Sequence, residues 1–527
     1  MENTLALDLR PDSPWPLHQQ VYEQIRLAIL SGRERSRQKL PASRQLAQSL
    51  GISRSTVTQS YDQLISEGYL ETRRGSGTFV CAQIPDTLLY TKRQLTTLTP
   101  SDTQPEAKPD AKTALSHSIP DSLSTYGQRL LKTVTLPTSI EETLSFRYWQ
   151  PDLSAFPRKQ WQRSITRCCA QTDDWMSYSP ESMGYEPLRQ AIATYITQSR
   201  AVHCTPQQIL ITQGTQQALS LIAKVLLNEG DAIALEDPGY LSARKVLSAH
   251  GARTFPISVD KQGRDVDRLD ILSRQTIPIK LAYVTPSHQF PTGVLMSLPR
   301  RLALLKWAQQ TGGFVIEDDY DSAFRYSGRP IPAPQGLDRH QRVLYVGTFS
   351  KIMFPGLRLG YIVLPPSLVP AFERAKWVCD RQSYLLNQAA LADFISQGHL
   401  AKHIRRMRTI YAQRRVKLIE LLTELSAPFG NLEIAGDPAG LHFMARLPIP
   451  PQRGSGQALK RAAKERGVAL FNVVAYRHPQ ALSAQIEQGQ TKQIDIEDFI
   501  FGFGGLNDTD LETAINRLRP LSSSSSL

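Results

Sequence analysis

Residues 343–364 read VLYVGTFSKIMFPGLRLGYIVL, and this stretch decides the fold of the larger part of the chain. The runs at its start and its end are apolar, β-branched and aromatic, as in buried strands. Between them lie Ser350, Lys351 and, seven residues on, Arg358, with Pro355-Gly356 turning the chain back. The stretch therefore predicts two buried strands joined by a polar turn.

The turn carries a lysine and an arginine that suit one kind of ligand. A lysine just beyond a buried strand is partly desolvated, which lowers its pKa toward the free amine that attacks an aldehyde. The reversal at Pro355-Gly356 lets the Arg358 fork hold a phosphate in the same pocket. An aldehyde bound by Lys351 beside a phosphate bound by Arg358 describes pyridoxal 5′-phosphate (PLP). Basic residues in a solvated turn are the alternative, so the rest of the chain must supply the other parts of the site.

Length, charge and cysteine usage limit the number of domains, the kind of partner and the compartment to be expected. The 527 residues, 41% of them hydrophobic, predict several domains and a large core. A formal net charge of +13 favours nucleic acid or another polyanion as a partner. Five cysteines without metal-ligand spacing predict no metal site and fit a reducing cytoplasm. Neither a secretory signal nor a membrane span is expected, because no apolar stretch is long enough.

The first eighty residues have the pattern of a helix-turn-helix. Apolar residues recur at helical spacing from Leu17 to Ser31, a short helix is expected after its cap Ser43, and a third helix follows its cap Ser53, with Gly51 in the turn. The start of the third helix carries side chains that bond to phosphates and base edges in a major groove. The candidate DNA-binding residues of the two later helices are Arg44, Ser53, Arg54, Ser55, Thr56 and Gln59.

A short hairpin follows the third helix. Residues 69–72 and 78–80 read as strands joined by a glycine-permitted turn that includes Arg73, Arg74 and Gly75, which predicts a wing with a positive tip. Residues 12–80 resemble the winged-helix domain of GntR-type bacterial regulators through LPASR (40–44), SRSTV (53–57), YDQL (61–64) and EGYL (67–70). Where that family usually has a Gly-rich approach to the Leu-Pro pair, this chain has the basic run 33–39, which adds candidate phosphate contacts.

Residues 81–140 are interpreted as a flexible linker. Prolines recur, polar residues abound and no periodicity is sustained, so the segment lacks the apolar surface that offsets ordering entropy. A coil wrapped on the surface of the larger domain is the alternative. A Ser-rich tail, 521–527, is expected to be disordered.

From Phe146 onward, apolar runs alternate with helical patterns, which predicts an α/β sheet. Polar residues follow the strand ends, where such sheets bind ligands. Thr215 and Gln216 begin a helix after a glycine turn that suits an anion, and Tyr240 is placed to stack on a flat ring. In the acidic run 317–321, one buried carboxylate would keep a pyridine nitrogen protonated and Tyr320 would hydrogen-bond the ring oxygen, although a solvated or calcium-binding acidic loop is the alternative.

Taken in order, these segments resemble a fold type I, aspartate-aminotransferase-like PLP domain over 141–520. With the winged helix, the chain resembles the MocR/GabR-type subfamily of GntR regulators through TPSHQFPTG (285–293), EDDYDS (317–322) and SKxxxPGxRxG (350–360). The resemblance implies Lys351 as the Schiff-base lysine, Asp318 on the pyridine nitrogen and Tyr320 on the ring hydroxyl. It also implies Tyr240 stacked on the ring and a phosphate held by Arg358, Thr215 and Ser350, with Gln216 beside them.

Two departures bear on activity. Phe290 stands where enzymes of this fold often carry Asn, leaving His288 or Gln289 as substitutes, and Ile500 stands where we expect the arginine that binds a substrate carboxylate. We therefore expect a homodimeric transcription factor that binds double-stranded operator DNA and senses PLP or an amine effector. A working aminotransferase with an attached DNA-binding domain is the alternative, as is a domain that only dimerises.

Overall fold

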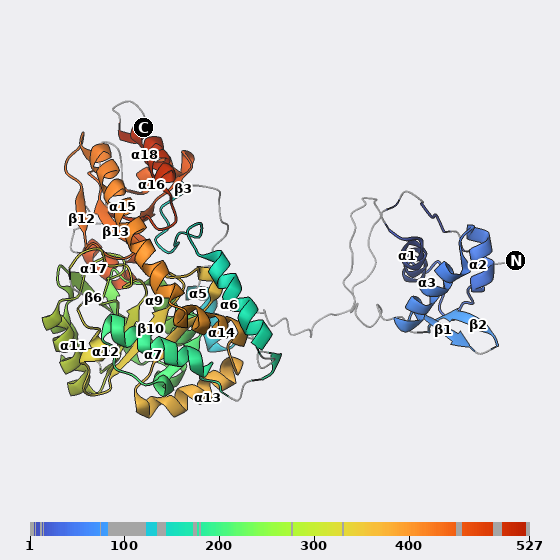
Figure 1. Ribbon diagram of the computed structural model, residues 1–527, viewed down its shortest axis with the longest axis horizontal. Helices are drawn as coiled ribbons and strands as arrows, with labels where there is room; N and C mark the ends of the chain where they lie inside the picture. The colour runs from blue at the N-terminus through green and yellow to red at the C-terminus, as the bar shows by residue number, and fades with distance from the viewer. Residues whose placement is uncertain are drawn as a thin grey trace, which may run out of the picture. The chain divides into compact units, whose positions relative to one another are not determined.

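The structure is a computed structural model that describes residues 5, 7–10, 13, 15–73, 75–82, 123–133, 144–171, 176–178, 181–275, 278–328, 331–448, 456–487 and 498–522. The chain forms two compact units, residues 1–114 and 115–527, coloured blue and cyan to red in Figure 1. Within the described residues, no helix is both long and apolar enough to cross a membrane.

The first unit is a winged helix. Helices α1 (Leu17–Leu30), α2 (Ser43–Leu50) and α3 (Arg54–Ser66) precede the antiparallel hairpin of β1 (Leu70–Arg73) and β2 (Gly77–Val80). The inner faces of α1 and α3 bury Val21, Ile25 and Val57 completely. Leu5 is 7% exposed in the same core, so the unit begins before the predicted boundary at residue 12.

Local signals explain the helix ends in this unit. The backbone N–H of Thr56 donates to Ser53 Oγ at 3.2 Å, which caps α3 as predicted. Gly51 ends α2 at a φ of 66°, where glycine has no Cβ penalty. Ser43 is not the cap of α2: it is the first helical residue, and Ala42 holds the cap position without a side-chain hydrogen bond.

The segment predicted as a linker contains a helix. Residues 125–133 form α5 (Thr125–Thr133), which contacts α9 (Leu241–Ala249) of the large unit. Tyr126 lies 5.0 Å from the ring of His250, and Arg129 forms an ion pair with Glu229. The expectation of an irregular tether is therefore wrong for these residues, because two docked side chains anchor one short helix. Residues 83–122 and 134–143 lie outside the described residues.

The large unit is built on an eight-stranded sheet in the order β4-β11-β10-β9-β8-β5-β6-β7. These strands are β4 (Ile209–Thr212), β5 (Ala232–Asp237), β6 (Arg253–Asp260), β7 (Gly263–Arg264), β8 (Ile279–Val284), β9 (Phe314–Asp319), β10 (Val343–Thr348) and β11 (Gly360–Val363). The two strands predicted from 343–364 are β10 and β11, which pair antiparallel. Strands β6, β5, β8, β9 and β10 run parallel, so their carboxyl ends meet at one edge.

Both faces of this sheet are buried, which explains the continuous apolar runs in its strands. Leu344 and Val346 of β10 pack with residues of α8 (Thr215–Leu226), α9 and α13 (Val369–Asp380). Tyr345, on the opposite face, packs with α7 (Glu186–Arg200), α14 (Leu385–Ser396) and α15 (His399–Ser426). Further along the sheet, α10 (Val266–Gln275) and α11 (Leu298–Thr311) cover the β8 and β9 side chains Ala282 and Val315.

A second sheet, in the order β12-β13-β16-β15, lies in the C-terminal part. Its strands are β12 (Glu433–Ala435), β13 (His442–Arg446), β16 (Asp498–Gly502) and β15 (Phe471–Asn472). Helix α18 (Asp508–Ser522) extends past the predicted domain end at 520, because Leu521 is buried in the core, while 523–527 lie outside the described residues. The remaining elements are β3 (Leu144–Ser145), α6 (Arg158–Gln171), α12 (Pro334–Leu337), α16 (Gly456–Glu465), β14 (Val468–Ala469), α17 (Pro479–Glu487) and the short 3₁₀ turns Pro206–Gln208, Pro355–Leu357, Pro366–Leu368 and Val473–Tyr476.

Candidate functional site

A cavity of about 300 Å³ opens at the carboxyl edge of the large sheet. Every residue predicted to hold PLP lines it: Lys351, Asp318, Tyr320, Arg358, Tyr240, Thr215, Gln216 and Ser350. They come from the ends of four strands, β4, β5, β9 and β10, and from the turn between β10 and β11. Residues more than a hundred positions apart meet because parallel strands bring their ends to one edge.

Lys351 follows β10 directly and is half-buried at the cavity wall. Its Nζ donates to the carbonyl oxygen of Trp149 at 3.0 Å. Burial lowers the pKa of this amine to about 8, although Asp321 and Asp318 oppose the shift. About a tenth of Lys351 is therefore the nucleophilic free amine at pH 7, far more than for a solvated lysine.

Asp318 lies in β9, beside β10, with 3% of its surface exposed. Its Oδ2 accepts a hydrogen bond from the Tyr283 hydroxyl at 2.7 Å, while its Oδ1 is buried without a partner among the described residues. Burial raises the pKa of this carboxyl to about 7. An unpartnered buried carboxylate oxygen at a cavity wall fits a protonated ring nitrogen, which would satisfy it.

The opposite end of the cavity suits a phosphate. Thr215 begins α8, and Gly214 before it has a φ of 88°. A Cβ on Gly214 would lie 3.3 Å from an Arg358 nitrogen, so the glycine leaves the guanidinium room. Arg358 Nη2 donates to the Gln213 carbonyl at 2.8 Å, which fixes the fork at the start of the helix. Backbone N–H groups at a helix start together with a guanidinium form a strong site for a phosphate dianion.

Tyr240 and Tyr320, the two tyrosines predicted to contact the cofactor ring, have different neighbours. Tyr240, directly before α9, lines the cavity and meets Phe290 edge-on with 5.8 Å between ring centroids. The hydroxyl of Tyr320 donates to the His288 carbonyl oxygen at 2.9 Å and lies 3.1 Å from His288 Nδ1. Tyr320 thus reaches the cavity while its hydroxyl contacts the residues behind it.

The structure adds cavity residues that the sequence reasoning missed. Tyr148 and Trp149 come from the loop between β3 and α6, and the aromatic run 146–149 was the signal available for them. Tyr283 lies within a strand that was predicted correctly, but its bond to Asp318 depends on the pairing of β8 with β9. The others are Ser242, Thr285, Phe290, Thr348 and Pro355.

The cavity wall away from the phosphate end is apolar and aromatic. Phe290 and Ile500 pack with Tyr148, Tyr476 and Val473 in one cluster. Neither of the substitutes considered for asparagine lines the cavity: Gln289 bonds to Glu236, Pro238 and Phe290, and His288 bonds to Asp321. Lys351 and Arg358 are the only cations among the lining residues that the structure describes.

The candidate DNA-binding side chains gather on the first unit. Arg44, Arg54, Ser55 and Gln59 are exposed on α2 and α3, as is the capping Ser53, while Thr56 is half-buried beside it. Arg73 is also exposed, but its guanidinium bonds to Glu71 at 2.6 Å and lies over the Phe79 ring. Gly75 has a φ of 75° at the wing tip, and Arg74 lies outside the described residues.

Comparison with known proteins places both units in families. Residues 17–80 match the gntR family of bacterial regulatory proteins, and residues 155–482 match the class I and II aminotransferases. A relative described as a probable rhizopine catabolism regulatory protein, MocR, from Rhizobium meliloti is 36% identical over 97% of this chain and 95% of its own length. This chain belongs to the MocR-type subfamily of GntR transcriptional regulators.

Other members and neighbours of this MocR-type regulator support the same assignment. A pyridoxine biosynthesis transcriptional regulator, PdxR, from Corynebacterium glutamicum is 30% identical over 83% of this chain and 85% of its own length. The kynurenine aminotransferase of Pyrococcus horikoshii, solved with its substrates and products, aligns with a TM-score of 0.64 at 27% identity, covering 74% of this chain and 96% of that one. The large unit therefore has the fold of PLP-dependent aminotransferases, and that fold implies use of PLP.

Proposed function

We propose that this MocR-type regulator binds PLP in the cavity of its large unit and that cofactor or effector occupancy changes how its winged helix binds an operator. The observation that carries the proposal is the convergence of Lys351, Asp318 and Arg358 on one cavity, with an unpartnered buried oxygen on Asp318. PLP supplies an electrophilic aldehyde on an electron-withdrawing ring.

Each end of the cavity has its own task. Arg358 and the start of α8 bind the phosphate and set the depth of the cofactor, while Tyr240 and Tyr320 position the ring. Lys351 would hold the cofactor covalently, because its free amine can condense with the aldehyde with loss of water. Asp318, buried and held by Tyr283, keeps a proton on the ring nitrogen.

The part of the cavity away from the phosphate end fits an effector sensor better than an enzyme that transaminates amino acids. Phe290 lines the cavity with the buried Ile500 packed in the same apolar cluster, where a carboxylate would need a cation, and Arg358 is already committed to the phosphate end. A carboxylate placed against that wall would be desolvated without a partner. The effector class that fits is therefore PLP itself or an amine without a carboxylate at this position.

A homodimer is proposed because the residues around α13 leave an apolar surface uncovered. Trp377 and Val378 are 54% and 79% exposed, and Tyr178 is 77% exposed. Arg381 stacks between Tyr178 and Trp377 at 4.7 and 5.3 Å from the ring centroids. Two winged helices in a dimer would read two half-sites of one operator. The free cysteines of the described chain are consistent with a cytoplasmic location.

The cofactor proposal is tested by absorbance. Wild-type protein mixed with PLP should gain a visible band that Lys351→Ala abolishes and Lys306→Ala retains, since Lys306 is exposed on α11 and does not line the cavity. A wild-type protein without such a band would sink the proposal. Operator affinity measured with and without PLP then tests regulation: equal affinities in both states would refute it while leaving cofactor binding intact.

A further inference from the structure

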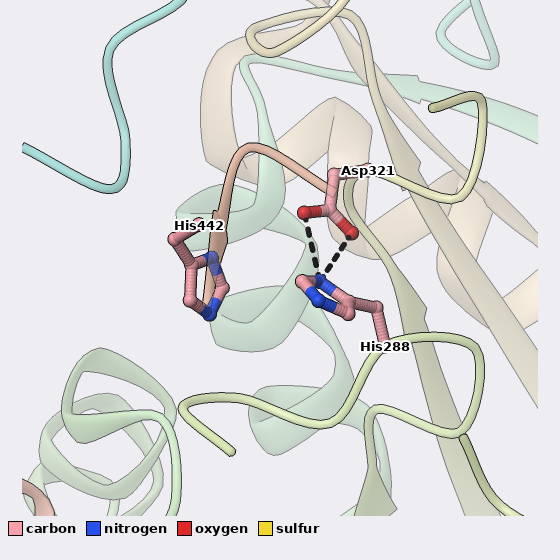
Figure 2. Close-up of side chains that lie close together, drawn as sticks. All are labelled: His288, Asp321 and His442. Atoms are coloured by element: carbon pink, nitrogen blue, oxygen red, sulfur yellow. Dashed lines mark hydrogen bonds and ion pairs between the residues drawn. The ribbon is translucent and has the colours of Figure 1, made fainter. Parts of the chain in front are cut away.

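Behind Tyr320, outside the residues that line the cavity, three polar side chains meet in a buried cluster. His288 follows β8, Asp321 follows β9, and His442 is the first residue of β13. Figure 2 shows the two imidazole rings and the carboxylate turned toward one another. Their exposed fractions are 2%, 2% and 0%, so bulk water does not solvate them.

The protein leaves this cluster short of hydrogen bonds. His288 Nδ1 lies 3.0 and 3.2 Å from the two Asp321 oxygens. Among the described residues, His288 Nε2 and both ring nitrogens of His442 have no hydrogen bond of normal geometry. His442 therefore has ring nitrogens that it can offer to an ion.

An unsatisfied buried nitrogen costs free energy, and an ion bound to one nitrogen of His442 would remove part of that cost. Two imidazoles and one carboxylate are a ligand set that divalent transition metals favour in proteins. One donor atom from each residue lies within 4.8 Å of the others. Ligand atoms on a tetrahedral zinc ion lie about 3.3 Å apart. His288 Nδ1 and Asp321 Oδ2, 3.0 Å apart, already fit this spacing, and the His442 nitrogen must move closer from a separation of up to 4.8 Å.

Glycines keep the space around the cluster open. A Cβ on Gly440 would lie 2.2 Å from His288 Cε1 and 2.3 Å from an Asp321 oxygen, and Gly440 has a φ of 70°. A Cβ on Gly293 would lie 3.1 Å from His288 Nε2. The two glycines therefore allow the backbone of both sheets to approach the rings without covering them.

We propose that His288 Nδ1, an Asp321 carboxylate oxygen and a ring nitrogen of His442 bind one divalent transition-metal ion. With Nδ1 bound to the ion, the ring hydrogen of His288 lies on Nε2. The ion links the carboxyl edge of the large sheet to the C-terminal sheet through β13. The bound ion also makes His288 Nδ1 unavailable to the Tyr320 hydroxyl, which lines the cavity. This consequence alone rests on the proposed cofactor site.

The test measures metal directly. Full-length protein is stripped with a chelator, dialysed against Zn²⁺ in the absence of PLP, and analysed for metal per chain. Wild type should retain one ion more than His442→Gln and Asp321→Asn, whereas His250→Gln, a half-buried histidine outside the cluster, should match wild type. Co²⁺ in place of Zn²⁺ should give an absorption spectrum of nitrogen and oxygen ligands without thiolate bands.

Two further measurements distinguish loss of the metal site from misfolding of a variant. Zn²⁺ should raise the melting temperature of wild type and His250→Gln but not of His442→Gln, because only a ligand of the folded state stabilises it. A PLP absorbance band in the variants would show that each is folded, and Asp321→Asn replaces His442→Gln if the latter does not fold. Equal metal content in wild type and folded cluster variants would overturn the proposal, as would no metal in wild type.

Discussion

In the winged helix most of the described candidate side chains are exposed, whereas in the aminotransferase-like unit they line a cavity, where Asp318 is buried, Lys351 is half-buried and Arg358 is exposed. Arg44 and Arg54 are exposed on helices, and their role depends on charge and reach. Asp318 and Lys351 take their chemistry from desolvation, which moves the pKa of one up to about 7 and of the other down to about 8. Surface sites should thus respond to salt and tolerate substitution, while buried sites should respond to pH and tolerate little.

The largest effect should come from removing the buried charge. Asp318→Asn keeps the shape but deprives a protonated ring nitrogen of its counter-charge, so PLP affinity should fall on the order of 100-fold, or about 3 kcal/mol. An absorbance titration checks this, with the exposed Asp267→Asn of α10 as the control. An affinity like that of wild type would mean that Asp318 does not face the ring nitrogen.

On the exposed side, charge removal should be milder and salt-dependent. Arg44→Ala with Arg54→Ala should weaken operator binding by about 1–3 kcal/mol and lower the slope of log affinity against log salt by about 2. Fluorescence anisotropy at several salt concentrations measures both, with Arg268→Ala combined with Lys306→Ala, exposed on α10 and α11 of the other unit, as the charge-matched control. A slope that stays at the wild-type value would place the DNA on another surface.

A pH series tests whether burial lowers the pKa of Lys351. Because burial lowers the pKa of Lys351 to about 8, the free amine is the minor form at pH 7 and the major form at pH 9. The rate of PLP attachment should rise up to about tenfold through pH 8 and then level off. Stopped-flow absorbance checks this; a rate that still climbs past pH 10 would indicate a solvated lysine. Because the unfolded pKa is 10.5, this group lowers the stability of the folded apoprotein as the pH falls from 10.5 to 8, and lowers it no further below pH 8.

The smallest effect concerns the helix that presents the DNA-binding residues. Ser53→Ala removes the acceptor for the Thr56 N–H and should destabilise the first unit by about 1 kcal/mol. Denaturant unfolding followed by circular dichroism measures this, with Ser66→Ala at the far end of α3 as the control. The PLP band should not change, since the two units are separate compact bodies. Equal stability of the two variants would show that the cap contributes nothing.

The sequence by itself determined the winged helix, the α/β class of the large unit and the residues that meet at its cavity. Those features follow from short-range patterns: the spacing in α3, the cap at Ser53, and the strand runs on either side of Lys351. Parallel strands with polar ends leave little choice about where those ends go.

Only the tertiary structure decided the contacts between distant segments. Tyr148 and Trp149 reach the cavity because a loop from near the start of the unit folds over β10. Tyr283 bonds to Asp318 because β8 pairs with β9 in one register, and His442 meets His288 because β13 approaches the large sheet at Gly440. Such contacts depend on packing between residues far apart in the chain, so the local spacing of residues does not predict them.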